Sequence, residues 1–195
     1  MTDSRILPQW HLAETSDDAS LVHAARDGDR NAFSRLYSRY SRMVHGILLA
    51  RVHSTEVNDL VQDVFLTALP RLGGLRDATR FGGWLAAITR NRAIDYHRQS
   101  HAAAAARQTL SEPDVDVQAT NDPACIRAET ILELIRSLPN AYRETLILRL
   151  VEGMNGPEIA ARTGLTPGSV RVNLHRGMRQ LRERLDGAMR KRSTP

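Results

Sequence analysis

Five arginines in a short stretch near the end of the chain suit nucleic-acid recognition: Arg171, Arg176, Arg179, Arg182 and Arg184. Arginine forms paired hydrogen bonds with phosphate and with the edge of guanine. The chemistry that this set predicts is binding to a nucleic-acid backbone and reading of base edges, without any bond being made or broken.

Two helix starts lie close together in the segment that carries these side chains, residues 155–185. Asn155 is expected to cap the first helix, with Glu158 as its reciprocal partner three residues later. Gly164 is expected to end that helix. Thr166 is then expected to cap a second helix. The sequence therefore predicts two helices joined by a tight turn.

The second of these helices should have one apolar side and several basic sides. Apolar residues recur every three or four positions, at Val170, Leu174, Met178, Leu181 and Leu185. A short helix, a glycine turn and a longer basic helix make a helix-turn-helix, whose second helix enters the major groove of DNA. An ordinary helical hairpin with solvated arginines is the alternative at this point.

A second polar constellation precedes it, in a helix expected to begin at a Ser54 cap. Asp59, Gln62 and Asp63 are spaced by three and four residues, so they should share one face of that helix. The face could bind a partner protein. Spacing alone favours a simple solvated face.

The next predicted helix, residues 82–98, combines aromatic, amide and basic side chains. Trp84, Asn91, Asp95 and Arg98 fall on one side, and further polar or aromatic candidates nearby are Arg80, Phe81 and Arg90. Exposed aromatic rings beside arginine and asparagine would let single-stranded bases stack and hydrogen-bond. The alternative is that the aromatic rings belong to the core, which is the better interpretation for Trp84.

The organisation expected from these patterns is all-α, with two small helical domains joined by a flexible linker. An acidic arm, residues 1–19, precedes a first helical block at 20–98. An acidic linker, residues 99–127, contains Pro113 and Pro123, and a second helical block covers 128–195. Each block carries a net charge of +5 against −3 for the arm and −2 for the linker. Two basic blocks suggest two contacts with a polyanion.

Composition argues against an enzyme, a metal protein and a membrane protein. The seven histidines are scattered, and no histidine–acid motif has metal-ligand spacing. Cys125 is the only cysteine, so an intrachain disulfide or a multi-cysteine zinc site is impossible. No apolar run is long enough to cross a membrane, and the first residues do not resemble a signal peptide. We expect no cofactor, no membrane contact and a cytoplasmic location.

Taken together, the two blocks resemble the extracytoplasmic-function family of bacterial RNA polymerase sigma factors. Residues 59–68, DLVQDVFLTA, resemble the polymerase-binding helix of sigma region 2. Residues 81–98, FGGWLAAITRNRAIDYHR, resemble the segment of that region that binds the promoter −10 element. Residues 138–153 and 169–182 resemble sigma region 4, which binds the −35 element.

The resemblance implies a role for each constellation. The core-polymerase contacts would be Asp59, Leu60, Gln62, Asp63 and Phe65, binding the clamp coiled coil of the largest subunit. The contacts with unpaired −10 bases would be Arg80, Phe81, Trp84, Arg90, Asn91, Asp95 and Arg98. The contacts with −35 duplex DNA would be Thr166, Ser169, Arg171, Asn173, Arg176 and Arg179.

Further partners that the resemblance implies are the flap of the second-largest polymerase subunit and an anti-sigma factor that holds the protein inactive. The expected function is therefore that of an alternative sigma factor, which binds core polymerase, recognises −35 duplex DNA and captures the opened −10 strand. The remaining alternative is a helix-turn-helix regulator that binds duplex DNA without polymerase. Such a regulator has no need of the polar face around Asp59 beside an arginine- and asparagine-bearing helix.

Overall fold

The structure, a computed structural model, describes the backbone of residues 18–108 and 123–192 and the side chains of residues 18–103 and 128–187. Every regular element in these ranges is helical, in agreement with the predicted all-α class. The arm at 1–17, the centre of the linker at 109–122 and the side chain of Cys125 lie outside the described residues. Within the described chain, no helix combines the length and the apolar character that a membrane span needs.

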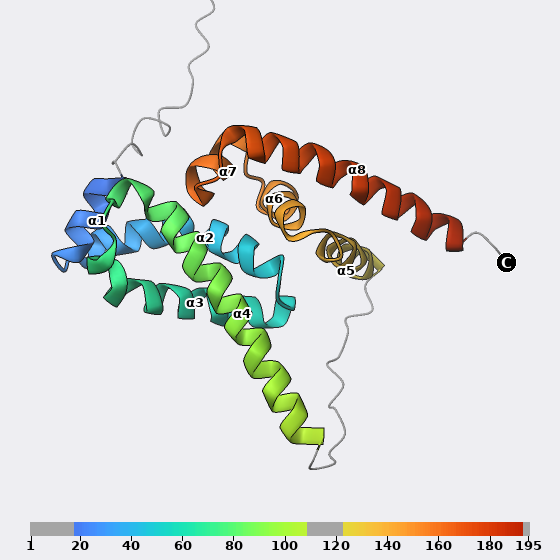
Figure 1. The fold of residues 1–195 in the computed structure, drawn as a ribbon, viewed down its shortest axis with the longest axis horizontal. Coiled ribbons are helices and arrows are strands. Elements are labelled where there is room, and N and C mark those ends of the chain that lie inside the picture. Colours follow the sequence, from blue (N-terminus) through green and yellow to red (C-terminus); the bar gives the residue numbers. More distant parts are fainter. Residues whose placement is uncertain (1–17, 109–122, 193–195) are drawn as a thin grey trace, which may run out of the picture.

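The N-terminal domain is formed by four α-helices and two short 3-10 turns: α1 (Asp18–Arg26), α2 (Arg30–Leu49), α3 (Ser54–Arg71), η2 (Leu72–Gly74), η3 (Ala78–Arg80) and α4 (Phe81–Gln108). The other three helices pack around α2 (Figure 1). Leu36, Met43 and Ile47 are fully buried on α2 because they recur at its helical period. The expected Ser54 cap is wrong: Ser54 is the first helical residue, and His53 holds the cap position without a side-chain hydrogen bond.

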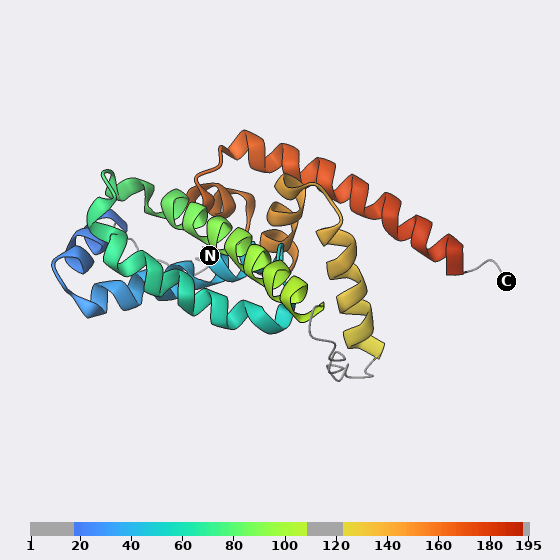
Figure 2. The ribbon, with the colours of Figure 1, turned by 60° about the horizontal axis from the view of Figure 1, so that its bottom comes forward.

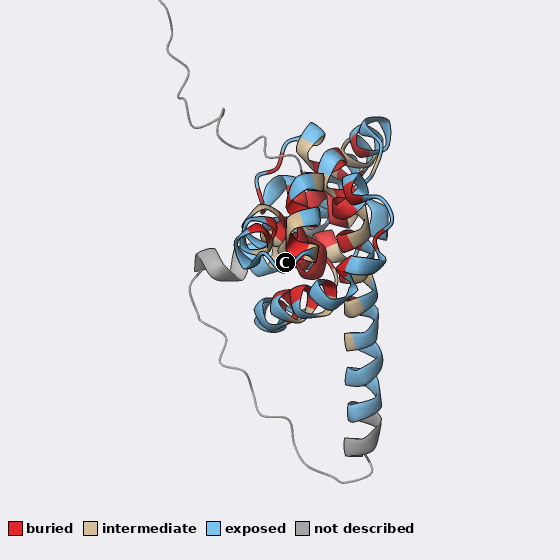
Figure 3. Cartoon of the chain, turned by 90° about the vertical axis from the view of Figure 1, so that its left-hand side faces the viewer, coloured by how far each residue is buried: buried red, intermediate tan, exposed pale blue. Residues whose placement is uncertain are grey.

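Helix α4 extends beyond the N-terminal domain. Its second half leaves the body of the molecule as a rod, and residues 97–103 on that rod are exposed (Figure 3). The first half is buried on one side by Leu85, Ala86 and Ala93. The predicted linker therefore begins as a continuation of α4.

The C-terminal domain contains α5 (Pro123–Arg136), α6 (Asn140–Leu150), α7 (Gly156–Thr163) and α8 (Pro167–Arg192). The predicted capping box is confirmed, since Asn155 and Glu158 exchange side-chain to backbone hydrogen bonds of 2.9 Å. Gly164 ends α7 with a φ of 73°, a left-handed conformation that glycine adopts without strain. Thr166 accepts a hydrogen bond from the amide of Ser169 at 3.1 Å and so caps α8, which gives the expected helix-turn-helix.

The two domains pack against each other, with α6 and α7 lying on α2 and α4 (Figures 1 and 2). Two glycines permit this close approach. A Cβ atom at Gly46 would lie 2.7 Å from a methyl carbon of Leu148, and one at Gly82 would lie 2.4 Å from the carbonyl oxygen of Arg162. The buried apolar residues form one cluster that continues from the first domain into the second.

Arginines from the second domain also hydrogen-bond to the C-terminal end of α2. Arg136 donates to the carbonyl oxygens of Leu49 and Val52 at 3.0 and 2.8 Å, and Arg143 donates to that of Ala50 at 3.4 Å. The last carbonyl groups of a helix have no partner within the helix and carry partial negative charge. Cations are therefore suitable partners, even though burial lowers the pKa of Arg136.

Candidate functional site

Helix α8 presents an exposed basic surface on the side away from the core. Ser169, Arg171, Arg176 and Arg179 are exposed, as is the capping residue Thr166. Asn173 is half-buried and lies at the edge of this surface. The opposite side of the helix is anchored by Val170 and Leu181, which are 1% and 4% exposed. The apolar stripe thus holds α8 in place and leaves the predicted nucleic-acid contacts open.

Two residues on this surface were missed by the sequence reasoning. Val172 is 42% exposed although it is apolar, and His175 is also exposed. Both line the same shallow pocket as Arg171 and Arg176. The sequence does contain a signal for their exposure, because Val172 and His175 fall outside the apolar stripe that begins at Val170.

A groove between α3 and α4 brings the two earlier constellations together. Asp63 and Leu66 line it from α3, and Asn91 and Asp95 line it from α4. Its volume is about 510 Å³. Arg92 crosses between the helices and binds the Asp63 carboxylate at 2.6 Å. The side chains predicted for polymerase binding and for −10 binding therefore meet at one surface.

The exposed face of α3 differs from the predicted set. Asp59 and Gln62 are exposed, and Asp63 is partly exposed. Leu60 and Phe65 are only 4% and 3% exposed. Phe65 packs against the rings of Phe33 and Tyr37 inside the domain. We therefore remove Leu60 and Phe65 from the set of direct contacts, because their surface is used to hold α3 against α2.

An apolar residue that was not predicted lies in the middle of the same face. Leu66 is 70% exposed, the highest value among the large apolar residues that are exposed in the described chain. It follows Asp59, Gln62 and Asp63 at intervals of seven, four and three residues, so all four lie along one side of α3. This gives the face an apolar centre with polar neighbours.

The start of α4 also requires a correction. Phe81 is completely buried and packs between the rings of Tyr40 and Trp84, with centroids 5.0 and 5.8 Å away. It cannot stack on a base in this arrangement, so we remove it from the DNA-contact set. Trp84 is half-buried, close to the core position that its pattern favoured. Arg80 is well exposed and pairs with Asp77 at 3.3 Å.

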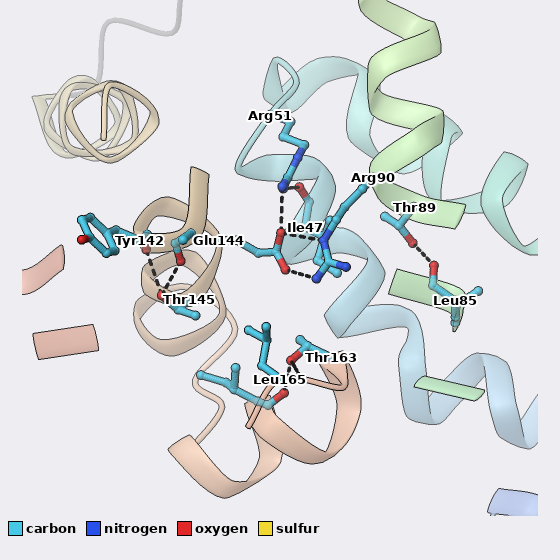
Figure 4. Close-up of polar contacts among 12 residues, drawn as sticks. Ile47, Arg51, Leu85, Thr89, Arg90, Tyr142, Glu144, Thr145, Thr163 and Leu165 are labelled. Atoms are coloured by element: carbon cyan, nitrogen blue, oxygen red, sulfur yellow. Dashed lines mark hydrogen bonds and ion pairs between the residues drawn. The ribbon is translucent and has the colours of Figure 1, made fainter. Parts of the chain in front are cut away.

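Beyond Trp84, the predicted residues of α4 divide into exposed and sequestered side chains. Asn91, Asp95 and Arg98 are exposed, and Arg98 lies 3.6 Å from Asp95. Arg90 is different, because its guanidinium donates hydrogen bonds of 2.6 and 3.1 Å to the Glu144 carboxylate on α6 (Figure 4). Glu144 is 4% exposed and also binds Arg51 at 2.8 Å. One buried carboxylate thus holds two arginines of the other domain.

No group of three or more metal-ligating side chains gathers anywhere in the described part of the chain. The geometry offers three candidate recognition surfaces. These are the exposed face of α3, the groove between α3 and α4, and the basic surface of α8.

Comparison with known families places both domains. The family model described as Sigma-70 region 2 matches residues 36–102, and the model described as Sigma-70, region 4 matches residues 128–181. The RNA polymerase sigma factor CarQ of Myxococcus xanthus is 34% identical over 163 residues, which cover 82% of this chain and 92% of CarQ. The ECF RNA polymerase sigma factor SigD of Mycobacterium tuberculosis is 32% identical over 87% of this chain and 84% of its own length.

The chain belongs to the extracytoplasmic-function sigma factors. Sigma factors are transcription initiation factors rather than enzymes. The three surfaces of this sigma factor are therefore candidates for binding its partners. The two matched segments contain all three surfaces, since α3 and the groove lie within residues 36–102 and the α8 surface lies within 128–181.

Two solved structures with a similar fold are complexes with a second protein. The structure of CnrH in complex with the cytosolic domain of CnrY is 25% identical, with a TM-score of 0.60 over 88% of this sigma factor and 98% of that chain. The sigma factor RpoE in complex with the anti-sigma factor NepR from Bartonella quintana has the same fold, with a TM-score of 0.53 over 79% and 96% of the two chains and 18% identity.

Proposed function

We propose that this chain directs core RNA polymerase to promoters by using its three surfaces together. The face of α3 binds polymerase, the groove between α3 and α4 captures the opened −10 strand, and α8 binds the −35 duplex. The observation that carries the proposal is the pairing of an exposed basic recognition helix with a separate groove lined by Asn91 and Asp95. A regulator that binds only duplex DNA would need the first of these and not the second.

The α8 surface supports duplex recognition by its shape and its side chains. Arg171 and Arg176 are exposed at the N-terminal half of the second helix of a helix-turn-helix, the part that reaches base edges in the major groove. Arg179 lies farther along the helix, where it can bind a phosphate and position the protein on the duplex. Binding should therefore depend strongly on salt.

The groove supports capture of single-stranded bases. Asn91 and Asp95 provide amide and carboxylate groups that can pair with base edges, and Ile88 provides an apolar wall. Unstacking a base costs a few kcal/mol, and a pocket that accepts the flipped base offsets this cost. Of the aromatic candidates, only Trp84 remains for stacking, since Phe81 is buried.

The face of α3 supports binding to a protein. An apolar side chain surrounded by polar groups is the usual composition of an interface centre and its rim. Leu66 is the apolar centre here, and Asp59 and Gln62 are exposed around it. We assign this face to the clamp of the polymerase. The second-largest subunit and an anti-sigma factor remain proposed partners without an assigned surface.

Use of Arg90 on DNA requires a change in the packing of the two domains. The Nε and Nη2 edge of its guanidinium is committed to Glu144 on α6. A phosphate could replace that carboxylate only if α6 moves away from α4. We infer that the packed arrangement is a resting state, and that promoter binding separates the domains.

The proposal is tested by asking whether the chain needs polymerase to recognise a promoter. The full chain is incubated with core RNA polymerase, and co-elution in size-exclusion chromatography is measured with and without DNA. We expect a stable complex with polymerase, and opening of −10 base pairs by that complex alone, detected by permanganate reactivity of unpaired thymines. Tight duplex binding by the free chain, with no co-elution and no reactive thymines, would instead support the duplex-only regulator.

A further inference from the structure

A basic cavity between the two domains is not used by any of the three recognition surfaces. It lies beside α2, where it is lined by Asn31, Ser34, Arg35, Ser38, Arg39 and Arg42, with Leu21 from α1 and Arg162 from α7 completing it. Its volume is about 450 Å³. Volumes of this size are typical of sites for small ligands. Among the described residues that form its wall, four are arginines and none is acidic.

The positive charge of the cavity is only partly compensated. Arg39 pairs with Asp18, and Arg162 donates to the backbone carbonyl oxygen of Arg39 and lies 3.9 Å from the Glu158 carboxylate. Arg42 lies 3.9 Å from Glu152, at the limit of an ion pair, because that carboxylate is held by His45 at 2.6 Å. Within the described part of the chain, no carboxylate lies within ion-pair distance of Arg35. At least one guanidinium is therefore free to bind an anion.

The spacing of the arginines on α2 indicates the kind of anion. Arg35, Arg39 and Arg42 follow one another at intervals of four and three, so they lie on one side of the helix. Like charges at this spacing repel each other. The outer two are separated by about 10 Å along the helix axis. Two linked phosphates carry more negative charge than one and present their oxygens over a longer span, so they suit this row of arginines better than a single phosphate does.

We propose that this cavity binds a small ligand that carries two or more linked phosphates. Arg35 and Arg42 would bind the two ends of the phosphate chain, since they are the more exposed members of the cluster. The hydroxyl of Ser34 and the side-chain amide of Asn31 line the same wall and can donate to phosphate oxygens. None of the described residues that line the cavity is aromatic, so the described wall recognises phosphates rather than a base.

Because the cavity lies between the domains, a bound ligand would affect how the domains pack. Arg162 belongs to α7 of the C-terminal domain, whereas the other three arginines belong to α2 of the N-terminal domain. A polyanion bound to both would hold the domains together. The ligand therefore stabilises the packed arrangement and opposes the separation proposed for promoter binding.

The experiment uses the full chain and pyrophosphate as the probe. Binding is measured by isothermal titration calorimetry, and sodium chloride or sodium sulfate at equal ionic strength serves as the reference. We expect saturable binding of pyrophosphate to one site, and slower hydrogen exchange of the α7 amides when it is bound. An equal response to sodium chloride or sulfate would overturn the proposal, because it would show general screening of charge.

Two variants with the same change of charge distinguish binding at the cavity from nonspecific attraction to the basic surface of the protein. Arg35→Gln/Arg42→Gln removes two cavity arginines, and Arg30→Gln/Arg76→Gln removes two exposed arginines elsewhere on the N-terminal domain. We expect the first to weaken pyrophosphate binding at least about tenfold, as loss of charge-assisted hydrogen bonds does, and the second to leave it unchanged.

Equal loss in both variants would contradict the proposal. So would binding of a short DNA duplex through Arg35 and Arg42 that pyrophosphate cannot displace, because the cavity would then be a DNA-backbone contact. Circular dichroism of each variant verifies that the helices are retained. These measurements involve neither polymerase nor promoter, so their failure would leave the proposed function standing.

Discussion

Glu144 on α6 binds Arg90 on α4 through two hydrogen bonds, of 2.6 and 3.1 Å, across the boundary between the two domains. The same carboxylate binds Arg51 at 2.8 Å and is almost completely buried. Desolvating a carboxylate is costly, and two arginines offset that cost. The pairing therefore adds a charged contact to the apolar packing between the domains, and one of the charged groups is a proposed DNA contact.

Replacing Glu144 with glutamine should loosen the packing of the domains. Arg51 and Arg90 would lose their charged partner in a partly buried setting, which should lower the free energy of unfolding by roughly 2 kcal/mol. The freed Arg90 should also increase binding of a single-stranded −10 oligonucleotide by the isolated chain. Urea unfolding and fluorescence anisotropy measure the two effects. Glu129→Gln, an exposed acid on α5, is the matched control, and identical behaviour of the two variants would refute the role of Glu144.

Replacing Leu66 with serine should weaken binding to core polymerase. The side chain is 70% exposed in the free chain, so its loss should change the thermal midpoint very little. Loss of a buried apolar centre from an interface should raise the dissociation constant for core polymerase about tenfold. Competition for core polymerase against a labelled sigma factor measures this. Ile131→Ser on α5, which is 41% exposed, should have no effect, and an equal loss there would argue against α3 as the contact.

Replacing Arg171 or Arg176 with alanine should weaken −35 binding by about 1–3 kcal/mol if each arginine contacts a base. Arg184 provides a control on the same helix, because it donates to the Ser137 hydroxyl at the start of the loop after α5. Its replacement by alanine should leave DNA affinity unchanged. Electrophoretic mobility shifts with a selected duplex compare the three variants. A loss for Arg184→Ala as large as the others would indicate that only net charge matters.

The exposed methyl groups of Val172 should contact a thymine methyl group in the major groove. Uracil lacks that methyl group, so substitution of uracil for thymine at one −35 position should weaken binding of the natural chain. The same substitution should have no effect on Val172→Ala. A fluorescence titration with the four combinations measures the coupling, and purely additive losses at every thymine would exclude this contact.

Local features of the fold could be predicted from the sequence, because they depend on neighbouring residues. The Asn155–Glu158 capping box, the Thr166 cap and the left-handed Gly164 each involve residues at most four positions apart. The apolar stripe of α8 was predictable for the same reason. The predicted cap of α3 at Ser54 is displaced by one residue, because His53 occupies the cap position without a side-chain hydrogen bond.

Contacts between distant residues could not be predicted in this way. Arg90 and Glu144 are 54 positions apart, and neither has a local pattern that indicates its partner. The sequence pattern leaves Phe81 open between the surface and the core, and the resemblance implies a base contact, whereas Tyr40 and Trp84 enclose the ring in the structure. Leu66 shows the opposite case, because an apolar residue is expected in the core, whereas its side chain is exposed in the structure.

The most direct test of the central claim is a run-off transcription assay with purified core RNA polymerase, the full chain and a pool of templates whose −35 and −10 elements are randomised. The account predicts transcripts that appear only when the chain is added, that share sequence at both elements, and that fall sharply with Arg171→Ala/Arg176→Ala. Selective binding of the chain to duplexes from the same pool, with no transcript above that of core polymerase alone, would contradict it.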